Sequence, residues 1–377
     1  MKFKSFLLLA LFSLATAPMY VSKADERGEH ERREGFVFVE DNGSVSNSIL
    51  AFHREPDGAL IPVGKFPTGG KGTGGGLGNQ GALTVSRNGR WLVAVNAGSN
   101  EVSVFRIKPF ALELTDKVSS GGRQPVSVTI KGGLVYVLNA GGNAGGADNI
   151  FGFRLTSRGT LLPLPDSERS LSAPSTGPAQ IQFDRSGDFL VVTEKNTNFI
   201  DLFDLDEDEG PESHRFLASP GKTPFGFAIG RDNEIIVSEA NGGVTNAGSL
   251  SAYRLRRNGA LQTLSPRVAD NQSAPCWVVI TEEGRFAYTS NTAGGTISSY
   301  SIDPGTGEIA LFETLSATIG AKSGPTDMAL TFESRFLYVL DPGSGMISAF
   351  RVLPDGKLKA LPSVSGIPAS ATGLVAD

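Results

Sequence analysis

A short phrase recurs seven times along the chain and constrains its fold more than any other feature. Each copy has a run of apolar, β-forming residues that ends in Asn, Asp or Glu. A polar or Gly-rich gap follows, and then a second apolar segment that ends in an aromatic residue. The first copy, for example, has 36–40 (FVFVE) followed by 49–52 (ILAF). The closing aromatic residues recur roughly every 50 residues, a period that is typical of propellers and solenoids.

Each repeat has room for about four short strands. Proline often precedes the first strand, where it costs no ladder hydrogen bond; these prolines are Pro125, Pro178, Pro224, Pro275 and Pro325. Gln80 takes the equivalent place in an earlier repeat. Gly turns such as 88–89 (NG) and 355–356 (DG) separate the segments, as expected for hairpins.

The two ends of the chain complement each other. The first repeat starts directly in its apolar run at Phe36, so it lacks a first strand. The segment 371–376 (ATGLVA) at the far end resembles 325–330 (PTDMAL), which is a first strand. We therefore expect an all-β, seven-bladed β-propeller with four-stranded blades, over residues 35–377, whose first blade is closed by the C-terminal strand.

The N-terminus has the pattern of an export signal. Lys2 and Lys4 precede an apolar stretch at 6–17, and small residues at 22–24 suit a signal peptidase. We predict a signal peptide over 1–24 and a polar leader over 25–34; a buried N-terminal helix is the alternative. The protein is then exported, to the periplasm or outside the cell, and the mature chain has no membrane span.

Charge and rare residues exclude several classes of function. The formal net charge is −5, and no basic stripe with interleaved aromatic residues appears, so we expect no nucleic-acid partner. Cys276 is the only cysteine, and we interpret it as a buried thiol, with a nucleophile as the alternative. The three histidines, His30, His53 and His214, lie outside the polar face described next, which argues against His-dependent triads and His metal sites.

The residues that end the second strands should form a circle on one face of the ring. They are Glu40, Asn96, Asn139, Glu194, Glu239, Asn291 and Asp341. One interpretation is that they cap turns by bonding nearby backbone. The other is that some line the channel mouth and bind ligand hydroxyls or a divalent cation, although the sequence requires no cofactor. The glutamates suit the second role better, because Glu is a poorer turn cap.

Other polar groups belong to the same face. Gly-rich loops lie at 68–81, 141–146 and 241–248, and they either bind anions through backbone amides or simply join strands. Arg123 stands just before a first strand. Asp327 lies inside a first strand, where a buried carboxylate needs a partner. The expected partner of this face is a small-molecule ligand or a protein.

At this point the chain resembles the seven-bladed propeller lactonases, which include 6-phosphogluconolactonases and carboxymuconate cycloisomerases. The resemblance covers roughly 35–377 and is firmest at 177–183 (GPAQIQF) and 188–203 (DFLVVTEKNTNFIDLF). In that family a Gly-Pro-Arg-His phrase precedes the inner strand and Asn-Glu ends the next one. The resemblance implies Glu194 as a general base, but Ala179 and Gln180 stand at the Arg and His positions.

Two hypotheses follow for the activity. The first is a lactone hydrolase, acting on a sugar or aromatic-acid lactone, with Glu194 as general base, Arg123 or Lys195 binding the anion, and Asp327 or Glu239 auxiliary. The second is a non-catalytic exported propeller that binds a small ligand, a cation or a protein. The missing Arg and His favour the second, because nothing evident replaces them in stabilising an oxyanion.

Overall fold

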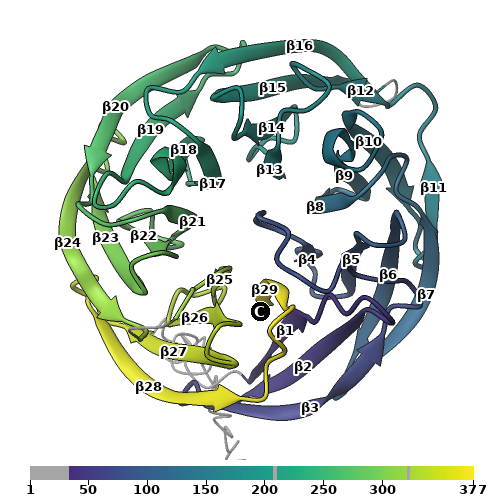
Figure 1. Ribbon diagram of the computed structural model, residues 1–377, viewed down its shortest axis with the longest axis horizontal. Helices are drawn as coiled ribbons and strands as arrows, with labels where there is room; N and C mark the ends of the chain where they lie inside the picture. Colours follow the sequence, from purple (N-terminus) through teal and green to yellow (C-terminus); the bar gives the residue numbers. More distant parts are fainter. Residues whose placement is uncertain (1–33, 207–209, 321–322) are drawn as a thin grey trace, which may run out of the picture. The chain divides into compact units, whose positions relative to one another are not determined.

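The computed structural model describes residues 34–206, 210–320 and 323–377. These residues form seven antiparallel sheets arranged in a ring, as Figure 1 shows, with the first strand of each sheet nearest the centre. The predicted propeller, with four-stranded blades, is confirmed. The predicted signal peptide lies outside the described residues, as does all of the leader except Glu34.

Each blade is named by its place in the ring, and its strands run from the centre outward. Blade 1 has β29 (Thr372–Ala376), β1 (Gly35–Glu40), β2 (Ser48–Arg54) and β3 (Leu60–Pro67); blade 2 has β4 (Leu83–Val85), β5 (Trp91–Asn96), β6 (Glu101–Lys108) and β7 (Ala111–Ser119); blade 3 has β8 (Pro125–Lys131), β9 (Leu134–Ala140), β10 (Asp148–Leu155) and β11 (Leu161–Pro163), with β12 (Arg169–Ser170) also pairing with β10. Blade 4 has β13 (Pro178–Phe183), β14 (Phe189–Glu194), β15 (Phe199–Asp206) and β16 (Gly210–Ala218); blade 5 has β17 (Pro224–Ile229), β18 (Glu234–Glu239), β19 (Ser249–Leu255) and β20 (Leu261–Ala269). Blade 6 has β21 (Pro275–Ile280), β22 (Phe286–Asn291), β23 (Thr296–Ile302) and β24 (Ile309–Thr318); blade 7 has β25 (Met328–Leu330), β26 (Phe336–Asp341), β27 (Met346–Val352) and β28 (Leu358–Ser365).

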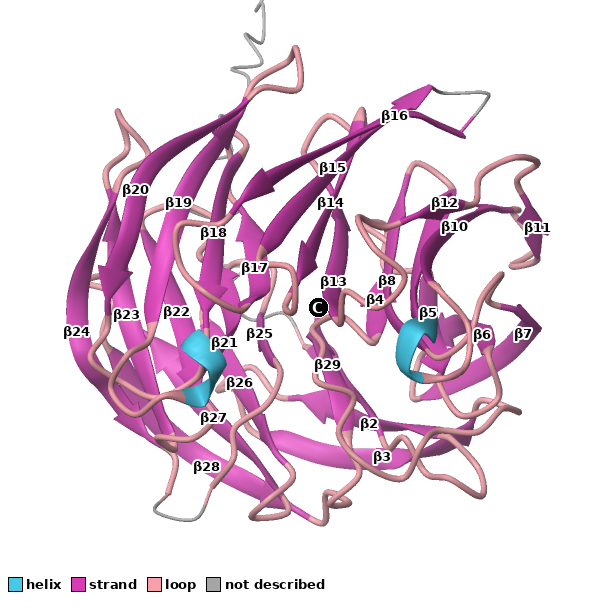
Figure 2. Ribbon diagram, turned by 45° about the horizontal axis from the view of Figure 1, so that its top comes forward, coloured by secondary structure: helices cyan, strands magenta, loops and turns pink. Residues whose placement is uncertain are grey.

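The core lies between neighbouring blades. Val93 and Val95 of β5 pack against Val135 and Val137 of β9, and all four are fully buried. Because the second strand of each blade is buried on both faces, it reads as a continuous apolar run rather than an alternating one. Two short 3-10 turns, η1 (Gly141–Asn143) and η2 (Asn241–Gly243), stand in the loops that follow β9 and β18; Figure 2 shows both. In the described part of the chain, no helix is long and apolar enough to cross a bilayer.

The C-terminal strand closes the ring, as predicted. β29 pairs antiparallel with β1, with Val37 opposite Ala376 and Val39 opposite Leu374. Leu374 is buried in the cluster that joins blades 7 and 1. Just past the strand, the Asp377 carboxylate accepts a hydrogen bond from the Phe36 backbone N–H. The last residues of the chain therefore supply the strand that the first repeat lacks.

A three-residue segment, Asn79–Gly81, lies across the centre of the ring. The Gln80 carboxamide donates to the Val278 carbonyl at 2.9 Å and accepts from the Val278 N–H at 3.2 Å, so it pairs with a strand of blade 6. The Gln80 N–H donates to the Ala179 carbonyl in blade 4 at 3.0 Å. The Ser127 hydroxyl of blade 3 donates to the Gln80 carbonyl at 2.7 Å.

The rest of this segment bonds blades 1, 3 and 7. Asn79 accepts a 3.1 Å hydrogen bond from the Thr372 hydroxyl of blade 1 and donates to the Val126 carbonyl of blade 3. Asp327 of blade 7 accepts hydrogen bonds from the backbone N–H groups of Gly81, Met328 and Leu374. The segment therefore links distant blades through polar groups.

Two first strands differ from the prediction. Gln80 does not begin a strand, since β4 starts at Leu83, and Pro325 also precedes its strand, since β25 starts at Met328. In both places side chains near the strand start bond to other blades: the Gln80 carboxamide bonds Val278 of blade 6, and the Asp327 carboxylate accepts from the Leu374 N–H of blade 1. The prolines at 125, 178, 224 and 275 do begin strands, as predicted.

Deletion of residues 372–377 should expose the edge of β1 and remove the buried Leu374. We expect a fall in Tm of about 10 °C or more, because several kcal/mol of strand pairing and burial are lost. A synthetic peptide of residues 366–377, added in trans, should restore part of the Tm, whereas a scrambled peptide should not. A deletion variant with the Tm of the intact protein would contradict this role of β29.

Gln80→Ala should leave the buried N–H and C=O groups of Val278 without their hydrogen-bond partners. Leaving buried donors and acceptors unpaired costs about 1–3 kcal/mol each, so we expect a loss of about 2–4 kcal/mol in denaturant unfolding. Gln262→Ala is the matched control, because Gln262 is exposed and its side chain bonds the exposed Arg256, at 2.6 Å. Equal unfolding midpoints for the two variants would show that the central segment is dispensable.

Candidate functional site

The polar residues at the ends of the second strands form the predicted circle, but their side chains are fully buried. The seven residues predicted to share one face are Glu40, Asn96, Asn139, Glu194, Glu239, Asn291 and Asp341, and each has 0% exposure. Side chains with no accessible surface do not line an open mouth. Their contacts in this structure are those of the turn-capping alternative, and direct ligand binding by these side chains stays a prediction.

Glu239 has hydrogen-bond partners for both carboxylate oxygens, whereas Glu40, Asn139 and Asn291 each have a buried side-chain oxygen with no partner among the described residues. Its carboxylate accepts hydrogen bonds from the hydroxyls of Ser219, Ser249 and Ser251, at 3.0, 2.5 and 2.6 Å, and from the Gly221 N–H at 3.0 Å. Hydroxyl and backbone donors of this kind satisfy a buried carboxylate without a ligand. Glu239 therefore holds together the loops that enter blade 5.

The amides and Asp341 have similar local roles. Asp341 accepts from the backbone N–H groups of Gly324 and Ser344, at 3.1 and 3.2 Å. Asn96 accepts from Asn47 at 3.0 Å, and Asn139 donates to the Ser120 carbonyl at 3.2 Å. Asn291 donates to the hydroxyls of Thr296 and Ser298, at 3.1 and 2.9 Å.

Glu194 differs from the others because its partners approach the surface. It accepts from the Ser172 N–H at 2.9 Å and from the hydroxyls of Ser172 and Thr197. Both hydroxyl residues are half-buried, whereas Glu194 itself is fully buried. The carboxylate that the family resemblance singles out is therefore separated from solvent by two hydroxyl groups.

A second carboxyl and an imidazole lie behind Glu194. Asp201 of β15 is fully buried, and its Oδ2 lies 3.1 Å from His214 Nε2 on β16. Burial raises the pKa of Asp201 to about 7; His214 lowers it and the nearby Glu194 raises it. The sequence analysis treated His214 as remote from the polar face, but the register of blade 4 connects it to Glu194 through Asp201. An aspartate between Ile200 and Leu202 in a strand was the available signal.

Lys195 follows β14 directly and extends toward Gly78, just before the central segment Asn79–Gly81. Its Nζ donates to the carbonyls of Gly78 and Pro178, the latter at 3.4 Å, and lies 4.9 Å from the centroid of the Phe225 ring. Burial lowers the pKa of Lys195 to about 8, against opposing effects of Cys276 and Asp148. At neutral pH the ammonium form therefore still dominates, so Lys195 can bind an oxyanion.

The remaining predicted residues do not join this group. Arg123 is exposed and donates to the Ala144 carbonyl at 3.0 Å, and Asp327 is buried among backbone N–H donors on the inner strands. Among the described residues, Arg123, Glu194, Glu239 and Asp327 share no hydrogen-bond partner. The auxiliary roles suggested for Glu239 and Asp327 stay predictions.

Two other predictions concern the centre of the ring. Cys276 is buried, as expected, and burial raises the pKa of its thiol to about 11, which makes it a poor nucleophile. Gln180 stands where the family has a histidine; its carboxamide accepts from the Phe227 N–H at 2.7 Å and donates to the Phe227 carbonyl at 2.9 Å. Within the described residues, no group of three or more His, Cys, Asp or Glu side chains is placed to hold a metal ion.

The proton on Asp201 should make stability depend on pH. A free aspartate has a pKa of about 3.9, so between about pH 4 and pH 7 the folded state keeps a proton that the unfolded chain releases. Stability from this group is fully present below about pH 4 and is lost as pH rises toward 7. Asp201→Asn removes the titration, so the variant should melt several degrees above the wild type at pH 8.

Melting curves from pH 4.5 to 8 test this expectation. Asp188→Asn is the control, because Asp188 is an exposed carboxylate of the same blade, and it should leave the pH slope unchanged. A Tm for Asp201→Asn below that of the wild type at every pH would show that Asp201 is stabilising in its charged form.

Comparisons with solved structures give the same fold. The chain is similar to a periplasmic gluconolactonase of Pseudomonas aeruginosa, with 17% identity, a TM-score of 0.73, and coverage of 91% of this chain and 99% of the other. It is similar to a proposed 6-phosphogluconolactonase of Bacteroides fragilis, with 17% identity, a TM-score of 0.71, and coverage of 91% and 98%. A Lactobacillus plantarum protein matches with 15% identity, a TM-score of 0.73, and coverage of 91% and 99%. A comparison with curated proteins finds no match.

The sequence itself matches the family described as "Lactonase, 7-bladed beta-propeller" over residues 32–147 and 235–372. The matched parts make up more than half of the chain. The unmatched part, 148–234, contains the whole of blade 4, with Gln180, Glu194 and Lys195. The blade where the expected Arg and His are missing thus departs from the family pattern. Fold and sequence together show that this chain belongs to the seven-bladed β-propeller lactonase family.

Proposed function

We propose that the protein is an exported lactone hydrolase that takes a sugar-acid lactone beside Lys195, on the face where the second strands end. The position of Lys195 carries the proposal. Its ammonium group lies over an aromatic ring near the centre of the ring of blades, in the neutral-pH charge state that suits a carboxylate or a developing oxyanion. Family membership and the export pattern of residues 1–24 support the rest of the proposal.

Glu194 supplies the base in this proposal, but through an intermediary. Water attacks the lactone carbonyl carbon, and its proton passes through the Thr197 or Ser172 hydroxyl to the Glu194 carboxylate. The bond between the carbonyl carbon and the ring oxygen then breaks, and the proton goes to that oxygen, which gives the open hydroxy acid. The hydroxyl contacts to Glu194 support this route, because they join a sealed carboxylate to half-buried groups.

Lys195→Met and Glu194→Gln separate binding from chemistry. With glucono-1,5-lactone as probe, Glu194→Gln should lower kcat about 100-fold or more and leave KM nearly unchanged. Lys195→Met should lower kcat/KM and weaken gluconate binding in calorimetry. Lys222→Met is the control, because Lys222 is an exposed lysine in the loop before the neighbouring inner strand.

Gluconate binding should also weaken as pH rises through about 8, when Lys195 loses its charge.

Two results would change the proposal. Gluconate or lactone binding that depends on Lys195, without hydrolysis by the wild type, would favour the non-catalytic ligand-binding propeller. Wild-type kinetics and binding in both variants would exclude this site altogether. In that case ligand or protein partners would have to be sought elsewhere on the ring.

A further inference from the structure

The opposite face of the ring carries the turns between first and second strands and between third and fourth strands. We call it the turn face. Two pockets lie on it at equivalent places, one between blades 2 and 3 and one between blades 4 and 5. They differ in charge, and this difference points to a ligand.

The pocket between blades 2 and 3 has a volume of about 550 Å³. Arg87 and Arg90 line it, together with Asn88, Ser157 and the base of Trp91. Among the described residues, no carboxylate lines this pocket, so its formal charge is +2 in a chain whose net charge is −5. Two arginines with no carboxylate beside them favour the binding of an anion in this pocket.

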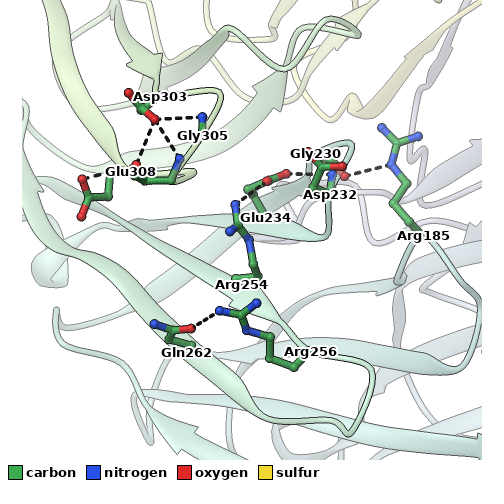
Figure 3. Close-up of polar contacts among 11 residues, drawn as sticks. Arg185, Gly230, Asp232, Glu234, Arg254, Arg256, Gln262, Asp303, Gly305 and Glu308 are labelled. Atoms are coloured by element: carbon green, nitrogen blue, oxygen red, sulfur yellow. Dashed lines mark hydrogen bonds and ion pairs between the residues drawn. The ribbon is translucent and has the colours of Figure 1, made fainter.

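The pocket between blades 4 and 5 provides an internal comparison. Three arginines line it, but so do three aspartates, and the formal charge is zero. Figure 3 shows two of its residues: Arg185 donates from Nε to the Gly230 carbonyl at 3.0 Å, and Asp232 donates from its backbone to Glu234 at 2.9 Å. Cations on the turn face are thus compensated in one pocket and uncompensated in the other.

The two arginines of the pocket between blades 2 and 3 differ in the contacts that hold their side chains. Arg90 is held in place, because its guanidinium lies 5.1 Å from the Trp91 ring centroid and donates to the Ser157 carbonyl at 3.3 Å. Arg87 is exposed and makes no hydrogen bond or ion pair with the residues that the structure describes. Its charge is felt by Lys131 of the next blade, whose pKa it helps to lower, after burial. The guanidinium group of Arg90 is therefore fixed, and that of Arg87 is free to move onto a ligand.

We propose that this pocket binds a small oxyanion, a phosphate, sulfate or carboxylate group, between Arg87 and Arg90. Guanidinium groups bind such anions through two parallel N–H donors. The Asn88 side-chain oxygen Oδ1 accepts from the Ser86 hydroxyl at 2.8 Å and from the Arg90 backbone N–H at 3.1 Å, so the amide N–H₂ of the same side chain is left as a further donor. Gly132 leaves the rim open, since a Cβ there would meet no atom within 4 Å.

The chain offers a built-in probe of this site. It has two tryptophans, Trp91 below the pocket and Trp277 in an inner strand of blade 6. An anion bound to Arg90, whose guanidinium lies 5.1 Å from the Trp91 ring centroid, should change the Trp91 fluorescence. Titration with inorganic phosphate, sulfate or acetate should give a saturable change in the wild type and in Trp277→Phe, and none in Trp91→Phe.

Arginine variants decide whether the site is specific. Arg87→Ala removes no hydrogen bond or ion pair with the described residues and should weaken phosphate binding at least tenfold, by fluorescence and by calorimetry. Arg231→Ala, in the compensated pocket, is the matched control and should bind as the wild type does. The ranking of the three anions identifies the chemistry that the pocket prefers. Equal loss in both variants, or no loss in Arg87→Ala, would overturn the proposal.

This site is independent of the lactone site. Arg87→Ala should keep the kinetics and gluconate binding of the wild type, since Arg87 lies on the other face of the ring from Lys195. A parallel fall in lactone turnover would mean that the arginine acts through the fold rather than through an anion. Lys195→Met should likewise leave phosphate binding unchanged.

Discussion

The polar segment Asn79–Gly81 at the centre of the ring is the contact on which the arrangement of blades depends. Neighbouring blades pack through apolar side chains, and that packing alone leaves the inner strands with no partner across the axis. Gln80 bonds blades 3, 4 and 6, Asn79 reaches blades 1 and 3, and Gly81 meets Asp327 of blade 7. A Cβ on Gly226 of blade 5 would lie 2.0 Å from the Gln80 side chain, so that blade, too, is shaped around the segment. Hydrogen bonds in such a buried place are costly to break, which makes the geometry unique rather than merely compact.

The architecture was predictable because it repeats. Seven copies of one phrase specify seven sheets, and the orphan strand at 372–376 specifies how the ring closes. What the sequence does not reveal is the use of Gln80, because its partner Val278 lies 198 residues away and belongs to no local pattern. Local periodicity determines strands and their faces. Contacts across the axis depend on the assembled ring, and the two-residue alternation of side chains along a strand does not predict them.

The candidate site was predictable only in part, for a physical reason. The circle of Asn, Asp and Glu at the strand ends is present, but the sequence analysis assumed that glutamate caps turns poorly. In blade 5 three serines and a backbone N–H surround Glu239, and in blade 4 two hydroxyl residues surround Glu194, so the longer side chain folds back and is fully satisfied. These donors lie in the neighbouring loops and strands, and their convergence requires the tertiary fold. Lys195, by contrast, was recognisable as the residue after Glu194, because alternation along the chain directs it away from Glu194.

Blade 4 shows how a family frame can change its chemistry without changing its shape. At the position where the resemblance implies a histidine, Gln180 forms two hydrogen bonds to the Phe227 peptide of blade 5, and Gln80 does the same to Val278 of blade 6. A carboxamide matches a peptide group in both donor and acceptor, whereas an imidazole offers one donor and one acceptor in a different geometry. The substitution thus exchanges an ionisable group for a structural tie between inner strands. The proposed mechanism therefore uses groups beside this tie, Lys195 and the hydroxyls on Glu194, which are half-buried.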